Sequence, residues 1–491
     1  MDELIRLSNA TLPELPTAIL RPTYDRSQLT PGIVHIGLGN FHRAHQSWYL
    51  HRLMQEGKAH DFAIVGAGVR DGDRAMRARL VAQDCLTTLI ELAPDAASAE
   101  VVGSMIDFVP VSRDNQPLIG ALMMPEIRIA ALTVTEGGYY LTADNGFDGD
   151  HPDMVHDSAN PQAPITAFGA IVAALRARRA AGGAPLTVQS CDNLQGNGAL
   201  VRQTVVSLAR LSDPDLSAWI EDNVSFPNAM VDCIVPATGR KEIEMAERFG
   251  IADPAPVTHE NFRQWVIEDD FCAGRPEWEA AGATFTNDVH AYEMMKLRVL
   301  NAGHQVLANA GEVLSLATIS DCMRSPLVAG LFRKVQQTEI LPNVDPVPGM
   351  TPAQYLELIE RRFSNGAIGD TVRRVAFDGS ARHTGFVLPV LRAQLKAGGG
   401  VGGLALVEAL WARMCTGERD DGSTIEPNDP HWARLQTAAW AARERPEAWL
   451  EQPEIYGDLK DAASFRDAFV RWLTQIHSSG AESALTAYRQ S

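Results

Sequence analysis

The sequence lacks the features of a secreted, disulfide-bonded or membrane-spanning protein. It has only six cysteines in 491 residues and no C-x-x-C pair, so neither a disulfide framework nor a cysteine zinc module is indicated. No apolar run approaches the roughly 20 residues that cross a bilayer. The N-terminal segment "MDELIRLSNATLPEL" also has no apolar core of the kind found in signal peptides. We therefore expect a cytoplasmic protein with reduced cysteines and no membrane partner.

Basic residues and metal-binding motifs are also scarce. The chain has 43 Lys and Arg against 61 Asp and Glu, which gives a formal net charge of −18. This is the wrong sign for neutralising phosphates, so we expect no nucleic-acid partner. The 13 histidines form no H-E-x-x-H motif and no compact group with zinc-ligand spacing. An organic cofactor is therefore a better candidate than a metal.

The remaining composition is that of an ordinary globular protein, with 45% hydrophobic and 21% charged residues. The length predicts two or three domains. Up to about residue 288, β-branched runs alternate with helical stretches; beyond it, Ala, Leu, Arg and Glu dominate with helical spacing. We predict an α/β domain with a parallel or mixed sheet over residues 1–288 and a mainly α-helical domain over 289–491.

Four strands are expected in the first domain, each ending in small or polar residues. In open α/β sheets, ligands bind beyond the carboxyl ends of the strands. The first strand leads into an expected helix over residues 41–57. The four strands are predicted at residues 32–40, 61–69, 126–139 and 185–193.

The segment "IGLGNFHRAH" has glycines at the position of a dinucleotide-binding turn. Gly37 and Gly39 have G-x-G spacing directly after a strand, where glycine permits a tight turn and close approach of a pyrophosphate. His42 stands where a third glycine is usual. After the next strand, Asp71 and Asp73 could accept hydrogen bonds from ribose hydroxyls. The alternative is an ordinary turn without a cofactor, followed by two solvated aspartates.

The segment "KLRVLNAGHQ" places polar residues on an otherwise apolar helix. At about 100° per residue, Glu293, Lys296, Asn301 and His304 fall within an arc of roughly 140° and could face one cavity. A lysine among apolar side chains loses its proton more easily and suits the role of general base. The alternative is a lysine that reaches water along the helix, with a histidine and an asparagine bonded to backbone.

Two further segments carry polar residues near strand ends. "QSCDNLQGNG" places Asp192 and Asn193 after a strand, and "FPNAMVDCIVPAT" places Asp232 among apolar residues. A buried carboxylate needs hydrogen-bond donors, which a substrate hydroxyl or a backbone amide can supply. Structural capping is the alternative for all three.

Taken in order, "GIVHIGLGNFHRAHQ", "LTVTEGGYY", "FPNAMVD", "QWVIEDDF" and "MMKLRVLNAGH" resemble the polyol-specific long-chain dehydrogenase/reductase family. Within it, the chain is most similar to the bacterial mannitol 2-dehydrogenase branch, with the fructuronate reductases close behind. The resemblance implies a Rossmann-type dinucleotide-binding N-terminal domain and a mostly α-helical C-terminal domain. It also implies a monomer and metal-independent hydride transfer between NAD and a small polyol or ketose.

The resemblance also implies roles for individual residues. Lys296 is matched to the catalytic base, Glu293 to its partner in proton exchange, and Asn193 and Asn301 to the groups that stabilise the oxyanion. The remaining matches are His304 at the catalytic centre, the substrate-binding residues Asp232, Arg374 and Arg382, and the cofactor-binding residues Ile36, Gly37, Gly39, Asn40, Phe41, Arg43 and Asp73.

Three positions depart from the family pattern. Cys233 follows Asp232 where an arginine is usual, Arg382 stands where a lysine is expected, and Gly72 replaces an acidic neighbour of Asp73. The first hypothesis is NAD-dependent interconversion of D-mannitol and D-fructose, with D-arabinitol and D-sorbitol as further candidates. The alternatives are a fructuronate reductase-type enzyme acting on D-mannonate, a catalytically silent NAD-binding or sugar-sensing protein, and a metal-dependent dehydrogenase.

Overall fold

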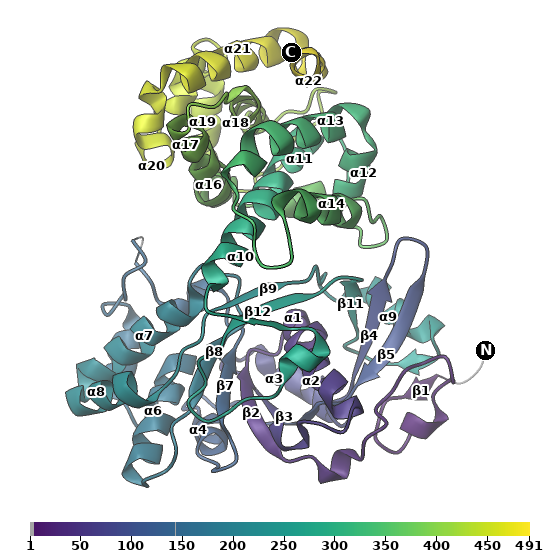
Figure 1. Ribbon diagram of the computed structural model, residues 1–491, viewed down its shortest axis with the longest axis vertical. Coiled ribbons are helices and arrows are strands. Elements are labelled where there is room, and N and C mark those ends of the chain that lie inside the picture. Colours follow the sequence, from purple (N-terminus) through teal and green to yellow (C-terminus); the bar gives the residue numbers. More distant parts are fainter. Residues whose placement is uncertain (1–3, 143) are drawn as a thin grey trace. The chain divides into compact units, whose positions relative to one another are not determined.

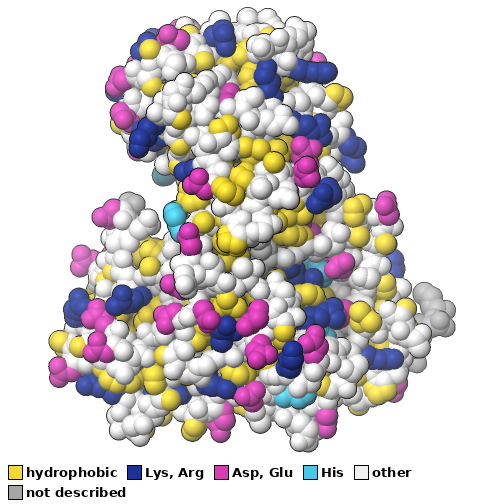
Figure 2. Space-filling model, viewed as in Figure 1, with side chains coloured by type: hydrophobic (Ala, Val, Ile, Leu, Met, Phe, Trp, Pro, Cys, Tyr) yellow, Lys and Arg dark blue, Asp and Glu magenta, His cyan; other side chains and the backbone are white. Residues whose placement is uncertain are grey.

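The computed structural model describes residues 4–142 and 144–491 and divides into two compact units, Met1–His290 and Ala291–Ser491 (Figure 1). We call them the N-terminal and C-terminal units and describe each by itself. Among the described residues, no helix is both long enough and apolar enough to cross a membrane. Acidic and basic side chains are interspersed over the face of the molecule shown in Figure 2.

A five-stranded parallel sheet forms the centre of the N-terminal unit. Its spatial order is β6-β3-β2-β7-β8, so the chain starts in the middle, moves to one edge and then crosses to the other. This is the order of a Rossmann-type fold, and the reversal between β2 and β7 marks the usual ligand position. The strands are β2 (Pro31–Ile36), β3 (Ala63–Ala67), β6 (Met105–Phe108), β7 (Ile129–Leu132) and β8 (Thr187–Ser190).

Both faces of the central strands β3, β2 and β7 are buried, which explains their nearly continuous apolar sequences. Val34 and Ile36 of β2 face one core, and Ile33, which directly precedes Val34, faces the other, which also holds Trp265 and residues of α2 (Gln46–Gln55). The helices of the first core are α4 (Gln116–Leu122), α5 (Pro152–Ala159), α6 (Ala167–Ala180), α7 (Asn197–Ser212) and α8 (Pro214–Asn223).

Further strands lie outside the main sheet and were not predicted from the sequence. β4 (Thr87–Leu92) pairs with β5 (Ala97–Val102) and β11 (Val257–Glu260). β12 (Gln264–Glu268) pairs with β9 (Ala229–Asp232) and β13 (Thr284–Thr286). The other elements are β1 (Ile5–Arg6), β10 (Ile251–Ala252), α3 (Asp73–Val81) and α9 (Arg240–Arg248).

The single helix predicted over residues 41–57 is wrong. The structure has α1 (Asn40–Ala44) and then α2, separated at His45, whose φ of −120° and ψ of −95° are not helical. Side-chain contacts hold this break. The His42 ring stacks on His35 of β2 with 3.5 Å between ring centroids, and His45 Nε2 lies 3.0 Å from the carbonyl oxygen of Gln264. An imidazole thus fills the place where a third glycine was expected.

The C-terminal unit consists of helices, and all of its residues are described. Every residue of α11 (Ala302–Val313) is buried, and this central helix packs against α12, α13, α15 and α18. The predicted α/β class with a mostly helical second part is confirmed. The other helices are α10 (Val289–Met295), which begins just before this unit, α12 (Ile319–Arg324), α13 (Pro326–Val335), α14 (Pro352–Phe363), α15 (Val372–Val375), α16 (Gly379–Arg382), α17 (Leu388–Lys396), α18 (Gly402–Met414), α19 (Trp432–Ala441), α20 (Pro453–Tyr456), α21 (Ala463–Ser479) and α22 (Ala481–Gln490).

Candidate active site

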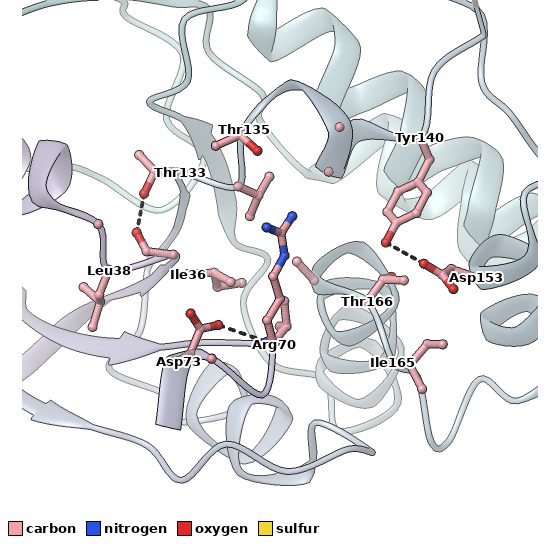
Figure 3. Close-up of a pocket in the computed structure, with 18 of the residues that line it drawn as sticks. Ile36, Leu38, Arg70, Asp73, Thr133, Thr135, Tyr140, Asp153, Ile165 and Thr166 are labelled. Carbon is pink, nitrogen blue, oxygen red and sulfur yellow. Dashed lines mark hydrogen bonds between the residues drawn. The ribbon is translucent and has the colours of Figure 1, made fainter. Parts of the chain in front are cut away.

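A cavity of about 640 Å³ opens at the carboxyl ends of β2, β3 and β7 (Figure 3). This is where the strand order reverses, and thus where a Rossmann-type fold binds its ligand. Four of the predicted cofactor-binding residues contribute to its wall. They are Ile36, Gly37, Gly39 and Asp73.

The two glycines of the first turn have different physical functions. Gly37 has a φ of +94°, and a Cβ there would lie 2.0 Å from the carbonyl oxygen of Thr133, so a larger residue cannot fit. Gly39 has an ordinary negative φ, and a Cβ there would meet no atom within 4 Å. Gly37 therefore allows the turn, whereas Gly39 leaves the cavity open for a ligand.

Asp73 lies at the first position of α3, where the turn after β3 ends. Its carboxylate accepts a hydrogen bond from the backbone N–H of Arg70 at 2.9 Å. Gly68 makes room for it, because a Cβ there would lie 2.4 Å from the Cβ of Asp73. The Arg70 side chain extends into the cavity (Figure 3). A carboxylate after the second strand is suited to the ribose hydroxyls of a dinucleotide.

Asp192 fixes the loop after β7, which forms another wall of the cavity. Its carboxylate accepts hydrogen bonds from the backbone N–H groups of Val134 and Thr135, each at 3.0 Å, and from the Tyr139 hydroxyl at 2.8 Å. Burial and the charge of Asp192 raise the pKa of Tyr139 well above its usual value, so the hydroxyl remains a donor. Asp192 therefore has a structural task at this cavity.

The other predicted cofactor-binding residues lie beside this cavity. Asn40 donates a hydrogen bond to the carbonyl oxygen of Pro236 at 2.8 Å and accepts one from Arg43 at 2.8 Å. Both residues line a neighbouring cavity of about 350 Å³. Burial lowers the pKa of Arg43 to about 10, which leaves it cationic. Phe41 stacks on His45 with 4.7 Å between ring centroids.

Most of the missed lining residues lie in loops whose direction the sequence does not reveal, and Asp153 lies in the first turn of α5. The sequence indicated them only by their position, because they come shortly after the end of a strand or near the start of a helix. Tyr140 donates a hydrogen bond to Asp153 across the cavity wall at 3.2 Å (Figure 3). The missed polar residues are Arg70, Thr133, Thr135, Tyr140, His151, Asp153 and Thr166.

In the C-terminal unit, Lys296 and Asn301 are the two ends of a π-helical turn, Lys296–Asn301, between α10 and α11. Lys296 is 7%, Asn301 9% and His304 8% exposed, so all three polar residues are largely buried. The assumption of a regular α-helix was wrong here. Residues five apart on an α-helix differ by about 140°. The wider π turn brings them closer to one face, and such turns are common at functional sites. Glu293 lies on α10 and is also buried.

His304 on α11 is a neutral imidazole with an unused ring nitrogen. Burial is the main cause that lowers its pKa to about 3; the charge of Asp370 opposes the shift, and nearby arginines add to it. The ring stacks on Phe363 with 4.1 Å between centroids. Its Nε2 atom is buried and has no hydrogen-bond partner within the described part of the chain, since Asp370 Oδ2 is 3.9 Å away. Such a nitrogen can bind a ligand hydroxyl.

Arg374 and Arg382 lie near His304. Arg374 makes two hydrogen bonds to Asp370, from Nε at 2.6 Å and from Nη2 at 2.7 Å. Arg382 donates to the carbonyl oxygen of Val375 at 3.3 Å. The charges of Arg374, Arg362 and Arg382 each lower the pKa of His304, which places all three near one imidazole.

Asp232 and Asn193 belong to the N-terminal unit. Asp232 is the buried last residue of β9, and Asn193 lies in the exposed segment after β8. Cys233 stands where an arginine is usual in the family. The loop after Asp232 is held by Ile234, whose backbone N–H donates a hydrogen bond to Glu260 at 2.6 Å. Among the described residues, no three His, Cys, Asp or Glu side chains gather as metal ligands would.

Comparisons with known proteins cover almost the whole chain. Residues 31–280 match the mannitol dehydrogenase Rossmann domain, and residues 288–477 match the mannitol dehydrogenase C-terminal domain. The mannitol 2-dehydrogenase of Cereibacter sphaeroides is 53% identical over 471 residues, which cover 96% of this chain and 99% of that protein.

Two solved structures are similar over the full length. One is the Pseudomonas fluorescens mannitol 2-dehydrogenase in a ternary complex with NAD and D-mannitol, with 38% identity and a TM-score of 0.88 over 99% of this chain and 100% of that chain. The other is a D-sorbitol dehydrogenase in substrate-free form, with 33% identity and a TM-score of 0.90 over 98% of this chain and 100% of that chain. The family expected from the sequence motifs is confirmed: this chain belongs to the mannitol dehydrogenase family.

Proposed function

We propose that this protein is an NAD-dependent mannitol 2-dehydrogenase that oxidises D-mannitol at C2 to D-fructose and catalyses the reverse reduction. Membership of the mannitol dehydrogenase family and the names of the relatives support the reaction class and the cofactor. The observation that carries the proposal is the buried polar group Lys296, Asn301 and His304 on one helical segment. Within the described part of the chain, Nε2 of His304 has no hydrogen-bond partner, and a polyol hydroxyl would supply one.

The cavity of the N-terminal unit fits a dinucleotide. Gly39 leaves space where the pyrophosphate would approach the backbone, and Asp73 offers a carboxylate for the ribose. A single carboxylate still disfavours a 2′-phosphate, so we propose NAD as the preferred cofactor. Gly72 and the cationic Arg70 lessen that preference compared with a site that has two acids. When bound, NAD accepts the hydride that leaves C2.

The side chains have separate tasks in this proposal. Lys296 takes the proton of the C2 hydroxyl, and Glu293 passes that proton on from the lysine. Asn193 and Asn301 donate hydrogen bonds to the oxygen as its negative charge develops, which is where preorganised donors lower the barrier most. The orienting contacts to the other hydroxyls are assigned to Asp232, His304, Arg374 and Arg382.

The pair between Arg374 and Asp370 favours a neutral substrate over a sugar acid. A carboxylate substrate would need an arginine fork, but Asp370 already occupies the Nε–Nη2 fork of Arg374 at 2.6 and 2.7 Å and neutralises its charge. The Asp370 carboxylate would also repel a second anion. The second candidate is an oxidoreductase of the fructuronate reductase type acting on D-mannonate. The three arginines near His304 and the replacement of a family lysine by Arg382 favour it.

The test is a substrate panel with purified protein and each cofactor. D-Mannitol, D-arabinitol, D-sorbitol and D-mannonate are oxidised with NAD or NADP, turnover is followed by formation of the reduced cofactor, and D-fructose is identified chemically as the product from D-mannitol. We expect the highest kcat/KM with D-mannitol and NAD and no effect of a chelator. Turnover of D-mannonate alone would select the second candidate. Tight NADH binding without turnover of any substrate would instead indicate a silent sensor, and loss of activity with a chelator would indicate a metal enzyme.

A further inference from the structure

The C-terminal unit contains a chain of buried polar side chains that the proposed reaction does not use. His383 and Glu408 are both 0% exposed. His383 Nδ1 lies 2.7 Å from Glu408 Oε1, and the Tyr456 hydroxyl donates to Glu408 Oε2 at 2.7 Å. On its other side, His383 Nε2 lies 2.8 Å from Asn309 Nδ2. A glutamate on α18 is thus linked through a histidine to the central helix α11.

The partners determine the direction of each hydrogen bond. A carboxylate accepts, so Nδ1 of His383 is the nitrogen that carries the proton toward Glu408, and Nε2 accepts from the amide of Asn309. The imidazole also stacks on Trp411 with 4.2 Å between ring centroids and an interplanar angle of 12°. His383 is therefore held in a single orientation with both ring nitrogens used.

This network meets the three segments that carry the candidate substrate-binding side chains of this unit. His383 directly follows Arg382 and begins the π-helical turn His383–Val387. Asn309 lies on α11, the helix of His304. Gln305, next to His304, donates a hydrogen bond to the carbonyl oxygen of Val375 at 3.1 Å, and Val375 directly follows Arg374.

Two further contacts close the connection. Arg382 donates to the same carbonyl oxygen of Val375 at 3.3 Å. Asn309 also donates to the carbonyl oxygen of Gln305 at 3.0 Å. Segments that are distant in sequence therefore share a few specific hydrogen bonds, and each of these bonds lies within one or a few residues of a side chain assigned to substrate.

Stability alone does not account for such a network. Buried charged and polar pairs pay a large desolvation cost, and well-packed apolar side chains often do as well or better. A π turn is also rare and departs from regular helix geometry. What directional hydrogen bonds add is a fixed relative placement of the segments that they join.

We propose that His383 is a positioning residue which, with Glu408 and Asn309, fixes the relative placement of His304, Arg374 and Arg382. This inference rests on the proposed function, because it takes those three side chains to contact the substrate. His383 itself does not touch the reacting atoms. Its loss should weaken substrate orientation while leaving the cofactor cavity of the N-terminal unit unchanged.

Two substitutions separate the two ends of the imidazole. His383→Asn places its amide near Nδ1, so it keeps a donor for Glu408 and loses the acceptor for Asn309. His383→Gln places its amide near Nε2 and keeps the acceptor for Asn309. We expect a KM for D-mannitol at least about 10-fold higher in His383→Asn, a factor that corresponds to one lost hydrogen bond. The rise should be smaller in His383→Gln, which loses the donor to Glu408 but keeps the link to α11, and the NADH Kd should be unchanged in both. Asn309→Ser should match His383→Asn and serves if that variant does not fold.

Trp472→Phe is the control for lost stability, because it removes a partly buried hydrogen bond to the carbonyl oxygen of Gly402 at 2.8 Å, outside the network. If its KM rises as much as that of His383→Asn at equal loss of unfolding free energy, the network is only structural and the proposal is overturned. Amide hydrogen exchange of residues 372–382 adds a readout without substrate, and it should be faster in His383→Asn and not in the control. If the wild-type protein oxidises no polyol, the proposed function fails, whereas equal exchange in all variants refutes the positioning role.

Discussion

Asp370 holds Arg374 through both of its carboxylate oxygens, at 2.6 and 2.7 Å. Burial alone would lower the pKa of Arg374, but the hydrogen bonds and the charge of Asp370 raise it. The guanidinium is thus neutralised by a partner on its own unit while part of it stays exposed. A substrate at this arginine meets a paired cation, which can donate to a hydroxyl but has little attraction for an anion.

Asp370→Asn should therefore shift the substrate preference from polyol to sugar acid. The amide cannot neutralise Arg374, so the free cation can pair with a carboxylate. We expect kcat/KM for D-mannitol to fall roughly 10-fold, the equivalent of one hydrogen bond, and the KM for D-mannonate to decrease. Steady-state kinetics on both substrates measure this. Glu360→Gln, which removes the surface pair with Arg333, is the control and should change neither value. Equal losses on both substrates would contradict the assigned role of Asp370.

Lys296→Ala should abolish most turnover and leave cofactor binding nearly intact. A general base contributes about 10²- to 10⁴-fold to the rate, so kcat for D-mannitol should fall by that factor while the NADH Kd changes little. In wild type, only the unprotonated amine can accept a proton, so polyol oxidation should accelerate as the pH rises and the reverse reduction should slow. Added primary amines should restore part of the lost rate. Near wild-type turnover in the variant would make the lysine structural.

The parts of this fold that the sequence predicts are those set by local pattern. The strands β2, β3 and β7 were found because both of their faces are buried and their apolar runs are nearly continuous. β8 was found from its β-branched residues Thr187 and Val188, which polar residues follow. The dinucleotide turn was found because Gly37 needs a positive φ that glycine adopts freely. The change from strands to helices near residue 289 was likewise predicted from composition, because β-branched runs give way to Ala, Leu, Arg and Glu.

The missed features depend on contacts between segments distant in sequence. The break at His45 follows from the packing of His42 on β2, which no helical periodicity reveals. The π turn at Lys296 changes the phase of the helix and cannot be read from a fixed angle per residue. Arg70 and Tyr140 enter the cavity wall through loops, one of which is held by Asp192 far along the chain. Site residues on regular elements were therefore easier to identify than those on loops.

Asp192→Asn should weaken cofactor binding through the loop after β7. One carboxylate oxygen becomes an amide donor, so either Val134 or Thr135 loses the acceptor of its backbone N–H. An unpaired buried group costs about 1–3 kcal/mol, and the loop should lose its fixed shape. We expect the NADH Kd to rise about 5- to 10-fold, as the loss of one backbone hydrogen bond would cause. The KM for D-mannitol should change less. Fluorescence titration with NADH measures the Kd. Asp213→Asn, which removes the ion pair with Arg176 away from the cavity, should leave the Kd unchanged.

His304 should make the protein less stable in mild acid. Burial lowers its folded-state pKa to about 3, whereas an unfolded histidine titrates near about 6.5. Between these values the unfolded chain binds more protons, so the free energy of unfolding falls as the pH decreases, by up to about 1.4 kcal/mol per pH unit. His304→Asn removes this contribution. Urea unfolding between pH 4.5 and 6.5 should show a shallower pH dependence in the variant, and identical slopes would show that His304 is protonated in the folded protein.

Alanine at Gly37 and at Gly39 should have opposite consequences, although the glycines are two residues apart. Gly37→Ala forces a Cβ to within 2.0 Å of the Thr133 carbonyl oxygen at a φ of +94°, so the turn must distort and the protein should lose several kcal/mol of stability. Gly39→Ala meets no protein atom within 4 Å, so its unfolding free energy should stay close to wild type. Its methyl group would instead occupy space that a pyrophosphate needs, and we expect the NADH Kd to rise at least about 10-fold, or 1.4 kcal/mol. Thermal unfolding with and without NADH separates the two effects, because only Gly39→Ala should keep the wild-type Tm and lose the stabilisation by NADH. Normal NADH binding by Gly39→Ala would place the pyrophosphate elsewhere.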